Sequence, residues 1–514
     1  MRTKSSIGAW FTFLFMIWML VFPLIAFDTQ AWGGGGFPGG INEPFGPRFG
    51  ESPQFPGGQR PQIQSGLDVV RRWNKIAIDA SGFDHTPVAP GELRIFGEQF
   101  GPCRASRAMA IVHIAIFDAV NAIAGGYHGY TDLLAADSAT SMDAAVAQAA
   151  HDTLVVLFPS QQANMDMLLA EDLGQLQDDQ VKERGIDLGM SAAAKILALR
   201  ADDGSGYAEP FWDQGYYTSN KAGVWRQDPI GQQPIALGAY WYKVKPFVMT
   251  TASQFRSPKP PALGSYAYEV AFNEVKLLGG DGIITPTIRT EDQTFIGIFW
   301  AYDGTPSLCA PPRLYNQLTT TIAAAKGTGV VELARLLALA NTAMADAAIT
   351  IWESKYHYLF WRPVTGIREA DRGTGPTGTG DFNPKTYADT NFTPLGAPAS
   401  NLSGPNFTPP FPSYPSGHAG FGGALFQILR LFYGTDDVAF TFVSDEFNGV
   451  TVDNQGNIRP LVPRSFTSFS QAEEENGQSR IYLGIHWVYD KTEGIAQGRK
   501  VGNYVFGKAF KRKR

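Results

Sequence analysis

The amino-acid sequence predicts an all-α protein in which two packed helical bundles are joined by long loops rich in proline and glycine. Three observations carry this prediction. From about residue 66, apolar residues recur at three- and four-residue steps, the spacing that places them on one face of a helix. No strand–helix alternation of the parallel α/β kind is visible. The chain has 514 residues, 44% of them hydrophobic and 18% charged, which is enough apolar material for a sizeable core.

The expected helices are separated by segments rich in glycine and proline, and Gly204 is a typical helix stop. Helices are expected at 105–124, 142–157, 161–173, 181–202, 266–278, 290–300, 313–327, 330–361, 417–433, 471–482 and 488–510. Long proline-rich connections are expected at 208–262 and 371–415. We therefore expect residues 66–514 to form one all-α body.

The N-terminal segment indicates export. Arg2 and Lys4 precede an apolar run over 7–27, and small residues follow near Ala31, a pattern typical of a secretory signal over residues 1–31. The run is also close to the ~20 residues that span a bilayer, so an uncleaved N-terminal membrane anchor is the alternative. Residues 32–65 are expected to be a flexible Gly/Pro-rich segment. Both alternatives place the body outside the cytoplasm, as a secreted, periplasmic or cell-surface protein, and no later stretch predicts a second span.

Charge and cysteine content exclude several classes of protein. The net charge of −6 provides no basic field that would favour nucleic acid. Two cysteines cannot build a disulfide scaffold or a four-thiolate metal site. Cys103 and Cys309 either form one long-range disulfide or remain two buried thiols. Seven histidines limit histidine-rich metal centres in the same way.

Three short blocks near the C-terminal end carry candidate functional residues, and the first runs from Lys355 to Pro363. Helical residues seven apart differ by about 700° of rotation, nearly two full turns. Lys355 and Arg362 are therefore expected on one face of one helix, about 10 Å apart along its axis, where both cations can converge on an anion. Pro363 is expected to end this helix.

The second block is Pro415-Ser416-Gly417-His418, which precedes a long apolar helix. Ser416 offers a hydroxyl and Gly417 a backbone amide at a helix start, where anions are favoured. His418 lies beside them and can transfer a proton. The alternative is an ordinary serine N-cap with an incidental histidine.

The third block runs from Ser479 to Asp490. Arg480 adds another guanidinium that can donate to an oxyanion. If a helical turn begins near His486, Asp490 can hold the Nδ1–H of its ring and leave Nε2 free as a nucleophile or metal ligand. The alternative is a histidine at a helix start that bonds a surface aspartate. Taken together, the three blocks suit a multiply charged oxyanion, because one cation alone would leave buried charge uncompensated.

In this order, the patterns K-x6-R-P, P-S-G-H and S-R-x5-H-x3-D resemble the three-part signature of the vanadium-dependent haloperoxidases. This superfamily is shared with type 2 phosphatidic acid phosphatases and bacterial acid phosphatases. The segments FWRPVTGIREAD and PPFPSYPSGHAGFGGALFQ are similar to their surroundings in the chloroperoxidase-like branch, and the strong matching covers about residues 345–505. The 60 residues between His418 and Ser479 form a long gap for the family and imply an inserted loop near 440–470.

The resemblance implies an enzyme that uses vanadate, a phosphate isostere, to oxidise halide with hydrogen peroxide to hypohalous acid. His486 would be the single protein ligand of vanadium, with Asp490 orienting its ring. His418 would act as acid and base, and Lys355 would polarise bound peroxide for halide attack. The groups that would hold the vanadate oxygens are Lys355, Arg362, Arg480, Ser416 and the amide of Gly417.

The same resemblance implies a halide side lined by Trp352 and Phe411, although both residues also fit an ordinary aromatic core. His357 matches no family ligand in its spacing, so we expect a structural role for it. The organic acceptor stays open, and two bundles leave surface for a homodimer.

Two other functions use the same residues. In a phosphatase, His486 would attack phosphorus and His418 would protonate the leaving oxygen. A non-catalytic protein would bind an oxyanion without turnover. The long N-terminal half and the aromatic pair favour the peroxidase.

Overall fold

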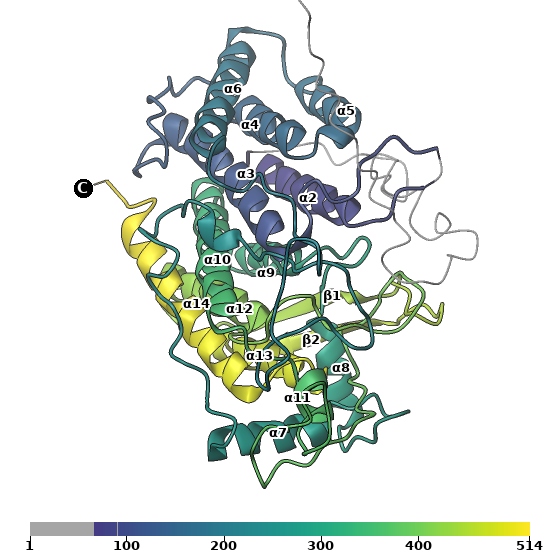
Figure 1. Ribbon diagram of the computed structural model, residues 1–514. Helices are drawn as coiled ribbons and strands as arrows, with labels where there is room; N and C mark the ends of the chain where they lie inside the picture. The colour runs from purple at the N-terminus through teal and green to yellow at the C-terminus, as the bar shows by residue number, and fades with distance from the viewer. Residues whose placement is uncertain (1–65, 90, 514) are drawn as a thin grey trace, which may run out of the picture.

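The computed structural model describes residues 66–89 and 91–513, which form a mostly helical protein (Figure 1). The predicted signal or anchor at 1–31 and the Gly/Pro-rich segment at 32–65 both precede this range and lie outside the described residues. The predicted all-α class is confirmed, and one two-stranded sheet is the exception in the part of the chain that the structure describes.

The first group of helices comes from the N-terminal part of the described chain. It consists of α2 (Gly66–Asp84), α3 (Gly101–Ala124), α4 (Met142–Leu157), α5 (Gln162–Leu173) and α6 (Gln180–Arg200), with a 3-10 turn at Pro159–Gln161 before α5. Helix α4 contacts each of the other four. It begins where the predicted helix begins, because Ser141 accepts a hydrogen bond from the amide of Ala144.

The second group holds the three sequence blocks. It consists of α9 (Pro311–Ala325), α10 (Val330–Tyr358), α12 (Gly417–Tyr433), α13 (Phe469–Tyr482) and α14 (Val488–Lys508). Helix α10 packs against both α12 and α14, and it also packs against α3 of the first group. The two groups therefore share one interface, in which α3 packs against α10 and the neighbouring helices α2 and α9 also meet.

Helices α3 and α10 are long and apolar enough to cross a membrane by length and hydropathy, whereas no such stretch was expected after the N-terminal run. In these helices, 83% and 94% of the apolar window is buried inside the protein. Their hydrophobicity is explained by their place in the core, where a helix is apolar on most sides.

Helices α7 (Tyr266–Leu278), α8 (Glu291–Phe299) and α11 (Pro363–Arg368) lie at the end of the molecule opposite the first group (Figure 1). Both α7 and α8 contact α13. The expected long connections are present, since 208–262 contains only a 3-10 turn at Trp241–Lys243 and 371–415 contains no helix.

The loop expected near 440–470 is instead an antiparallel hairpin of β1 (Phe440–Asn448) and β2 (Leu461–Phe466). Alternate residues at the start of β1 are buried, which is the two-residue period of a half-buried strand. Phe440 lies opposite Phe466, and their ring centroids are 5.1 Å apart. The prediction of a loop was wrong, since alternate residues of this segment face the core and the chain pairs as strands.

Cys103 and Cys309 are buried free thiols, and they belong to separate hydrophobic clusters. The Sγ atom of Cys309 lies 2.9 Å from the hydroxyl of Ser81. The two cysteines are therefore separate thiols, and the alternative of one long-range disulfide is excluded.

Glycines let α12 and α14 cross closely. A Cβ atom on Gly498 would lie 2.0 Å from the carbonyl oxygen of Gly420, and one on Gly494 would lie 2.6 Å from that of Ser416. Because α12 begins at the second sequence block and α14 follows the third, this close crossing brings the two blocks together.

We predict that Gly498→Ala lowers the free energy of unfolding by about 1–3 kcal/mol, because the new methyl group meets backbone atoms that cannot turn aside. Gly507→Ala in the same helix is the matched control, since a Cβ there meets nothing within 4 Å. The control should be neutral or stabilising by up to about 1 kcal/mol. Urea unfolding of both variants measures this, and equal stabilities would contradict the close crossing.

Candidate functional site

The three sequence blocks meet in one buried cluster. Its side chains come from the end of α10, the start of α11, the start of α12, the last turn of α13 and the turn before α14. Each is at most 5% exposed: Lys355, Arg362, Ser416, His418, Arg480, His486 and Asp490. His486 contacts both a cation and a carboxylate of the cluster, since its ring nitrogens lie 2.9 Å from Arg362 Nη1 and 2.9 Å from Asp490 Oδ2.

Lys355 and Arg362 do not share a helix, so the predicted common helix face was wrong. Helix α10 ends at Tyr358, because Leu359 adopts a left-handed conformation with φ 50° and its amide bonds the carbonyl of Lys355. Arg362 is instead the N-cap of α11, and Pro363 begins that helix. The two cations still converge, but a turn in the backbone brings them together.

The segment before α12 holds both of these cations. Lys355 Nζ donates to the carbonyls of Pro412 at 2.8 Å and Ser413 at 2.9 Å, and Arg362 Nε donates to the carbonyl of Phe411 at 3.0 Å. Burial and the charge of Arg362 lower the pKa of Lys355 well below its usual value. Burial also lowers the pKa of Arg362 to about 9. Backbone oxygens therefore position these cations without neutralising their charge.

The ring of His486 is held in one tautomer. Its Nδ1 lies 2.9 Å from Asp490 Oδ2, and its Nε2 lies 2.9 Å from Arg362 Nη1. A guanidinium can only donate, so Nε2 is the acceptor. The hydrogen atom of the neutral ring is therefore on Nδ1, which donates a hydrogen bond to Asp490. The expected pairing of His486 with Asp490 is confirmed, with Asp490 buried rather than at the surface.

Asp490 is itself held by two further donors. Its Oδ2 atom accepts from the amide of Trp487 at 3.0 Å and from the hydroxyl of Ser413 in a short hydrogen bond. Burial raises the pKa of Asp490, while these donors favour the ionised form. Ser413 was missed in the sequence analysis, although it lies three residues before Ser416 in the same block.

His418 keeps both ring nitrogens free at the start of α12. Neither Nδ1 nor Nε2 has a hydrogen-bond partner, and burial together with the charge of Arg480 lowers the pKa of His418 well below its usual value. The hydroxyl of Ser416 caps α12 by accepting from the amide of Ala419 at 3.3 Å, and this leaves its own proton free to donate. The amide of Gly417 is one of the first amides of the helix, which have no partner within it. His418 is thus a neutral acid–base group beside hydrogen-bond donors.

Arg480 is oriented by Asp303, a residue that no sequence pattern pointed to. Arg480 Nη2 lies 2.7 Å from both carboxylate oxygens of Asp303, whereas Nε and Nη1 are buried without a partner. Asp303 comes from the loop after α8, far from the three blocks in sequence. The ion pair turns the unpartnered side of the guanidinium away from Asp303.

The charge balance of the cluster fits an oxyanion. Within the described part of the chain, the three buried cations share the cluster with two carboxylates, Asp303 and Asp490. Asp228 also acts on Arg362 from a crevice beside it. A buried cation left without a counter-charge is costly. The free N–H groups of Arg480 and the amide of Gly417 are further donors for oxygen atoms. Among the described residues, no group of three or more His, Cys, Asp or Glu side chains could hold a metal cation. The donor set therefore fits an oxyanion such as vanadate or phosphate.

Trp352 and Phe411 form one wall beside the cations. Their ring centroids are 4.9 Å apart, and Lys355 Nζ lies 5.1 Å from the centroid of Phe411. His357, by contrast, is exposed near the end of α10, where it lies 3.4 Å from Arg256 Nη1. The structure thus brings together every candidate site residue and leaves His357 outside, as expected.

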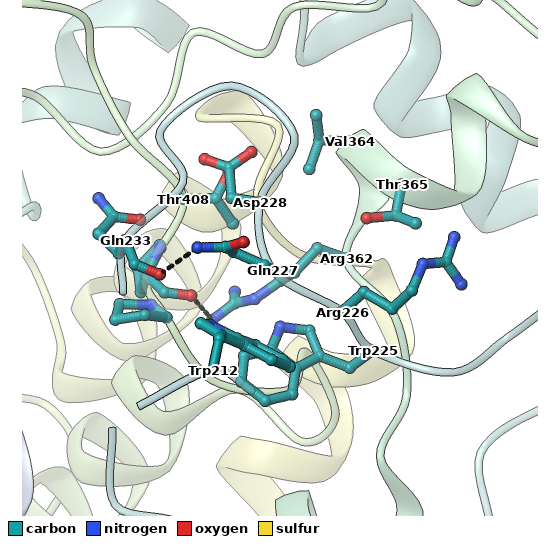
Figure 2. Close-up of a pocket in the computed structure, with 12 residues that line it drawn as sticks. Trp212, Trp225, Arg226, Gln227, Asp228, Gln233, Arg362, Val364, Thr365 and Thr408 are labelled. Carbon is teal, nitrogen blue, oxygen red and sulfur yellow. Dashed lines mark hydrogen bonds between the residues drawn. The ribbon is translucent and has the colours of Figure 1, made fainter. Parts of the chain in front are cut away.

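A crevice reaches Arg362 from the side of the 208–262 connection (Figure 2). It encloses about 260 Å³, including the space at its open mouth, and Trp212 and Trp225 form part of its lining. Arg362 Nη2 donates to the carbonyl of Pro409 in its wall at 3.3 Å. Arg362 is therefore the residue shared by the crevice and the cluster.

Comparisons with known proteins agree with this geometry. The family model of the VCPO second helical-bundle domain matches residues 335–513. Vanadium chloroperoxidase from Curvularia inaequalis is 30% identical over 503 residues, which cover 81% of this chain and 78% of that protein.

Solved structures share the fold. A bacterial vanadium-dependent iodoperoxidase is similar with a TM-score of 0.66 and 23% identity, over 87% of this chain and 97% of that chain. The apo form of a bacterial vanadium-dependent chloroperoxidase has a TM-score of 0.58 and 18% identity, over 82% and 96% of the two chains. Since the similarity to the Curvularia protein spans most of both chains, this chain belongs to the vanadium-dependent haloperoxidase family.

Proposed function

We propose that this protein is an exported vanadate-dependent haloperoxidase that oxidises halide with hydrogen peroxide to hypohalous acid. The observation that carries the proposal is the neutral Nε2 of His486, which is surrounded by three buried cations and backed by Asp490. Family membership supports the same activity.

In this proposal, His486 would hold vanadate through Nε2, and the bound group would supply a Lewis acid that activates peroxide. Lys355, Arg362 and Arg480 balance the negative charge of the anion, since each is buried where its charge is poorly screened. Ser416 and the amide of Gly417 donate hydrogen bonds to the oxygen atoms. Phosphate has a similar shape and charge and would compete for the same donors.

The two histidines have different tasks in this mechanism. Asp490 accepts the hydrogen bond from Nδ1–H of His486 and so keeps Nε2 unprotonated. The lone pair of Nε2 accepts from Arg362 Nη1 in this structure, and Arg362 would give up this hydrogen bond when the anion binds. His418 is neutral with two free ring nitrogens, so one of them can accept a proton from hydrogen peroxide and release it later. Lys355, which also lies near Trp352 and Phe411, can polarise peroxide on the side where halide would approach.

The deciding experiment loads phosphate-free apo-protein with orthovanadate and measures peroxide-dependent halogenation of a phenol-type indicator. We expect activity with vanadate, none without it, and inhibition when phosphate is added before vanadate. Phosphate-ester hydrolysis without vanadate-dependent halogenation would favour the phosphatase. Anion retention without either activity would favour a binding protein.

We predict that the two histidine variants fail in different ways. His486→Ala should weaken vanadate retention more than about 100-fold, because it removes the protein ligand itself. His418→Ala should retain vanadate but lose turnover by about 10²–10⁴-fold, as expected for loss of an acid–base group.

Equilibrium dialysis with vanadium quantified by mass spectrometry measures retention, and steady-state halogenation measures turnover. His357→Ala is the matched control, since His357 is exposed and outside the cluster. Equal loss of retention in the His486 and His418 variants would contradict the assigned tasks.

Export is the part of the proposal that rests on residues 1–31 alone. We expect a mature N-terminus near residue 32 when the protein is expressed with its own leader in an exporting host. Intact-mass measurement of the extracytoplasmic protein tests this. A full-length N-terminus in the membrane fraction would indicate the anchor, and cytoplasmic full-length protein would contradict export.

A further inference from the structure

Trp352 is held between two glycines. A Cβ atom on Gly238 would lie 2.3 Å from both Cδ1 and Nε1 of Trp352, and one on Gly417 would lie 2.9 Å from its Cη2. The pyrrole edge of the indole therefore packs against the backbone at 238, and the benzene edge packs against the start of α12. Nothing larger than glycine fits at 238 without moving this ring.

The backbone at Gly238 belongs to a short buried strap, residues 237–238, in the long connection between α6 and α7. The carbonyl of Leu237 accepts from Trp352 Nε1 at 3.2 Å and from the hydroxyl of Tyr356 at 2.8 Å. The amide of Leu237 donates to the carbonyl of Pro410 at 2.9 Å, next to Phe411. The strap is thus bonded to both sides of the aromatic wall.

A carboxylate connects the strap to the first helical group. The amide of Gly238 donates to Glu209 Oε2 at 2.7 Å, and Glu209 forms a short ion pair with Arg104 of α3. Both side chains are 13% exposed, so this link is largely shielded from water. The first group of helices therefore supports the aromatic wall through Arg104, Glu209 and the strap.

We propose that Gly238 and the strap are positioning elements that set the halide preference by fixing Trp352 against Phe411 and Lys355. This inference rests on the proposed haloperoxidase function. The strap makes none of the contacts described above for His486, Arg480 or Asp303, and it reaches the anion donors Lys355 and Gly417 only through the indole of Trp352. Its main effect is therefore on the halide side. Halides differ chiefly in size and hydration, so a shifted wall discriminates among them.

Gly238→Ala tests the proposal in the full chain loaded with vanadate. The methyl group displaces the indole from Gly238. Because Gly417 blocks movement at the opposite edge, the ring must change its angle to the ring of Phe411. We expect kcat/KM for iodide to fall relative to bromide by about tenfold, the usual effect of one methylene in a tight pocket. Vanadate retention should change by a smaller factor than the halide ratio, because His486, Arg480 and Asp303 are not in contact with the strap, and a larger loss of retention would overturn the proposal.

Gly434→Ala is the matched control. Gly434 has φ 72° against 76° for Gly238, so both substitutions strain the backbone alike, but a Cβ at 434 meets nothing within 4 Å. The control should leave the iodide-to-bromide ratio unchanged. An equal shift in both variants would assign the effect to general backbone strain and overturn the proposal.

A double-mutant cycle with Trp352→Ala provides a readout that a merely structural role would not move. Alanine lacks the whole indole that the new methyl group meets, so Gly238→Ala should change the halide ratio far less in this background. Additive effects would overturn the proposal.

Tyr356→Phe keeps the test decisive if Gly238→Ala does not fold. It removes only the hydroxyl that bonds Leu237, and we expect the ratio to change by at least about twofold, the smallest usual worth of such a bond. An unchanged ratio in an active Tyr356→Phe enzyme would overturn the inference alone. A wild-type protein without any halide oxidation would overturn the proposed function and the inference together.

Discussion

The structure depends on the burial of three like charges around one histidine. Lys355, Arg362 and Arg480 are almost fully buried, and the carboxylates inside the described cluster are Asp303, which pairs with Arg480, and Asp490, which pairs with His486. Such an arrangement is costly in a medium of low dielectric constant unless an anion and well-placed dipoles compensate it. Backbone carbonyls near the start of α12 supply part of the compensation, and the remainder is what a multiply charged oxyanion would supply.

This constraint explains why the fold has so many supports outside the cluster. The close crossing of α12 and α14 places the blocks that contain His418 and His486 together, and glycines make that crossing close. The interface of α3 and α10 then anchors the second group to the first. Through Glu209 and the strap at 237–238, the first group also reaches the aromatic wall. A protein that consisted of the second group alone would lack this support for the aromatic wall.

Most of the helical architecture could be predicted, because helix starts and stops are local. The expected helices at 142–157, 266–278 and 417–433 have the observed bounds, and a serine N-cap begins each of them. One error occurs where a long-range contact decides the end of a helix. Leu359 leaves the helical conformation beside a bridge between Phe360 and Val224, a contact across more than a hundred residues. The hairpin of β1 and β2 was missed although its alternation is visible.

The sequence by itself determined which chemical groups are available: three cations, two histidines, a carboxylate at the right spacing and a glycine amide at a helix start. Spacing within a block is enough for this, because His486 and Asp490 are four residues apart and meet in one turn. Only the tertiary structure decided that these groups share one buried volume, that Arg362 approaches from a separate helix, and that Asp303 and Ser413 orient them. Such contacts join residues far apart in the chain, and only the packing of the helices can bring them within hydrogen-bond distance.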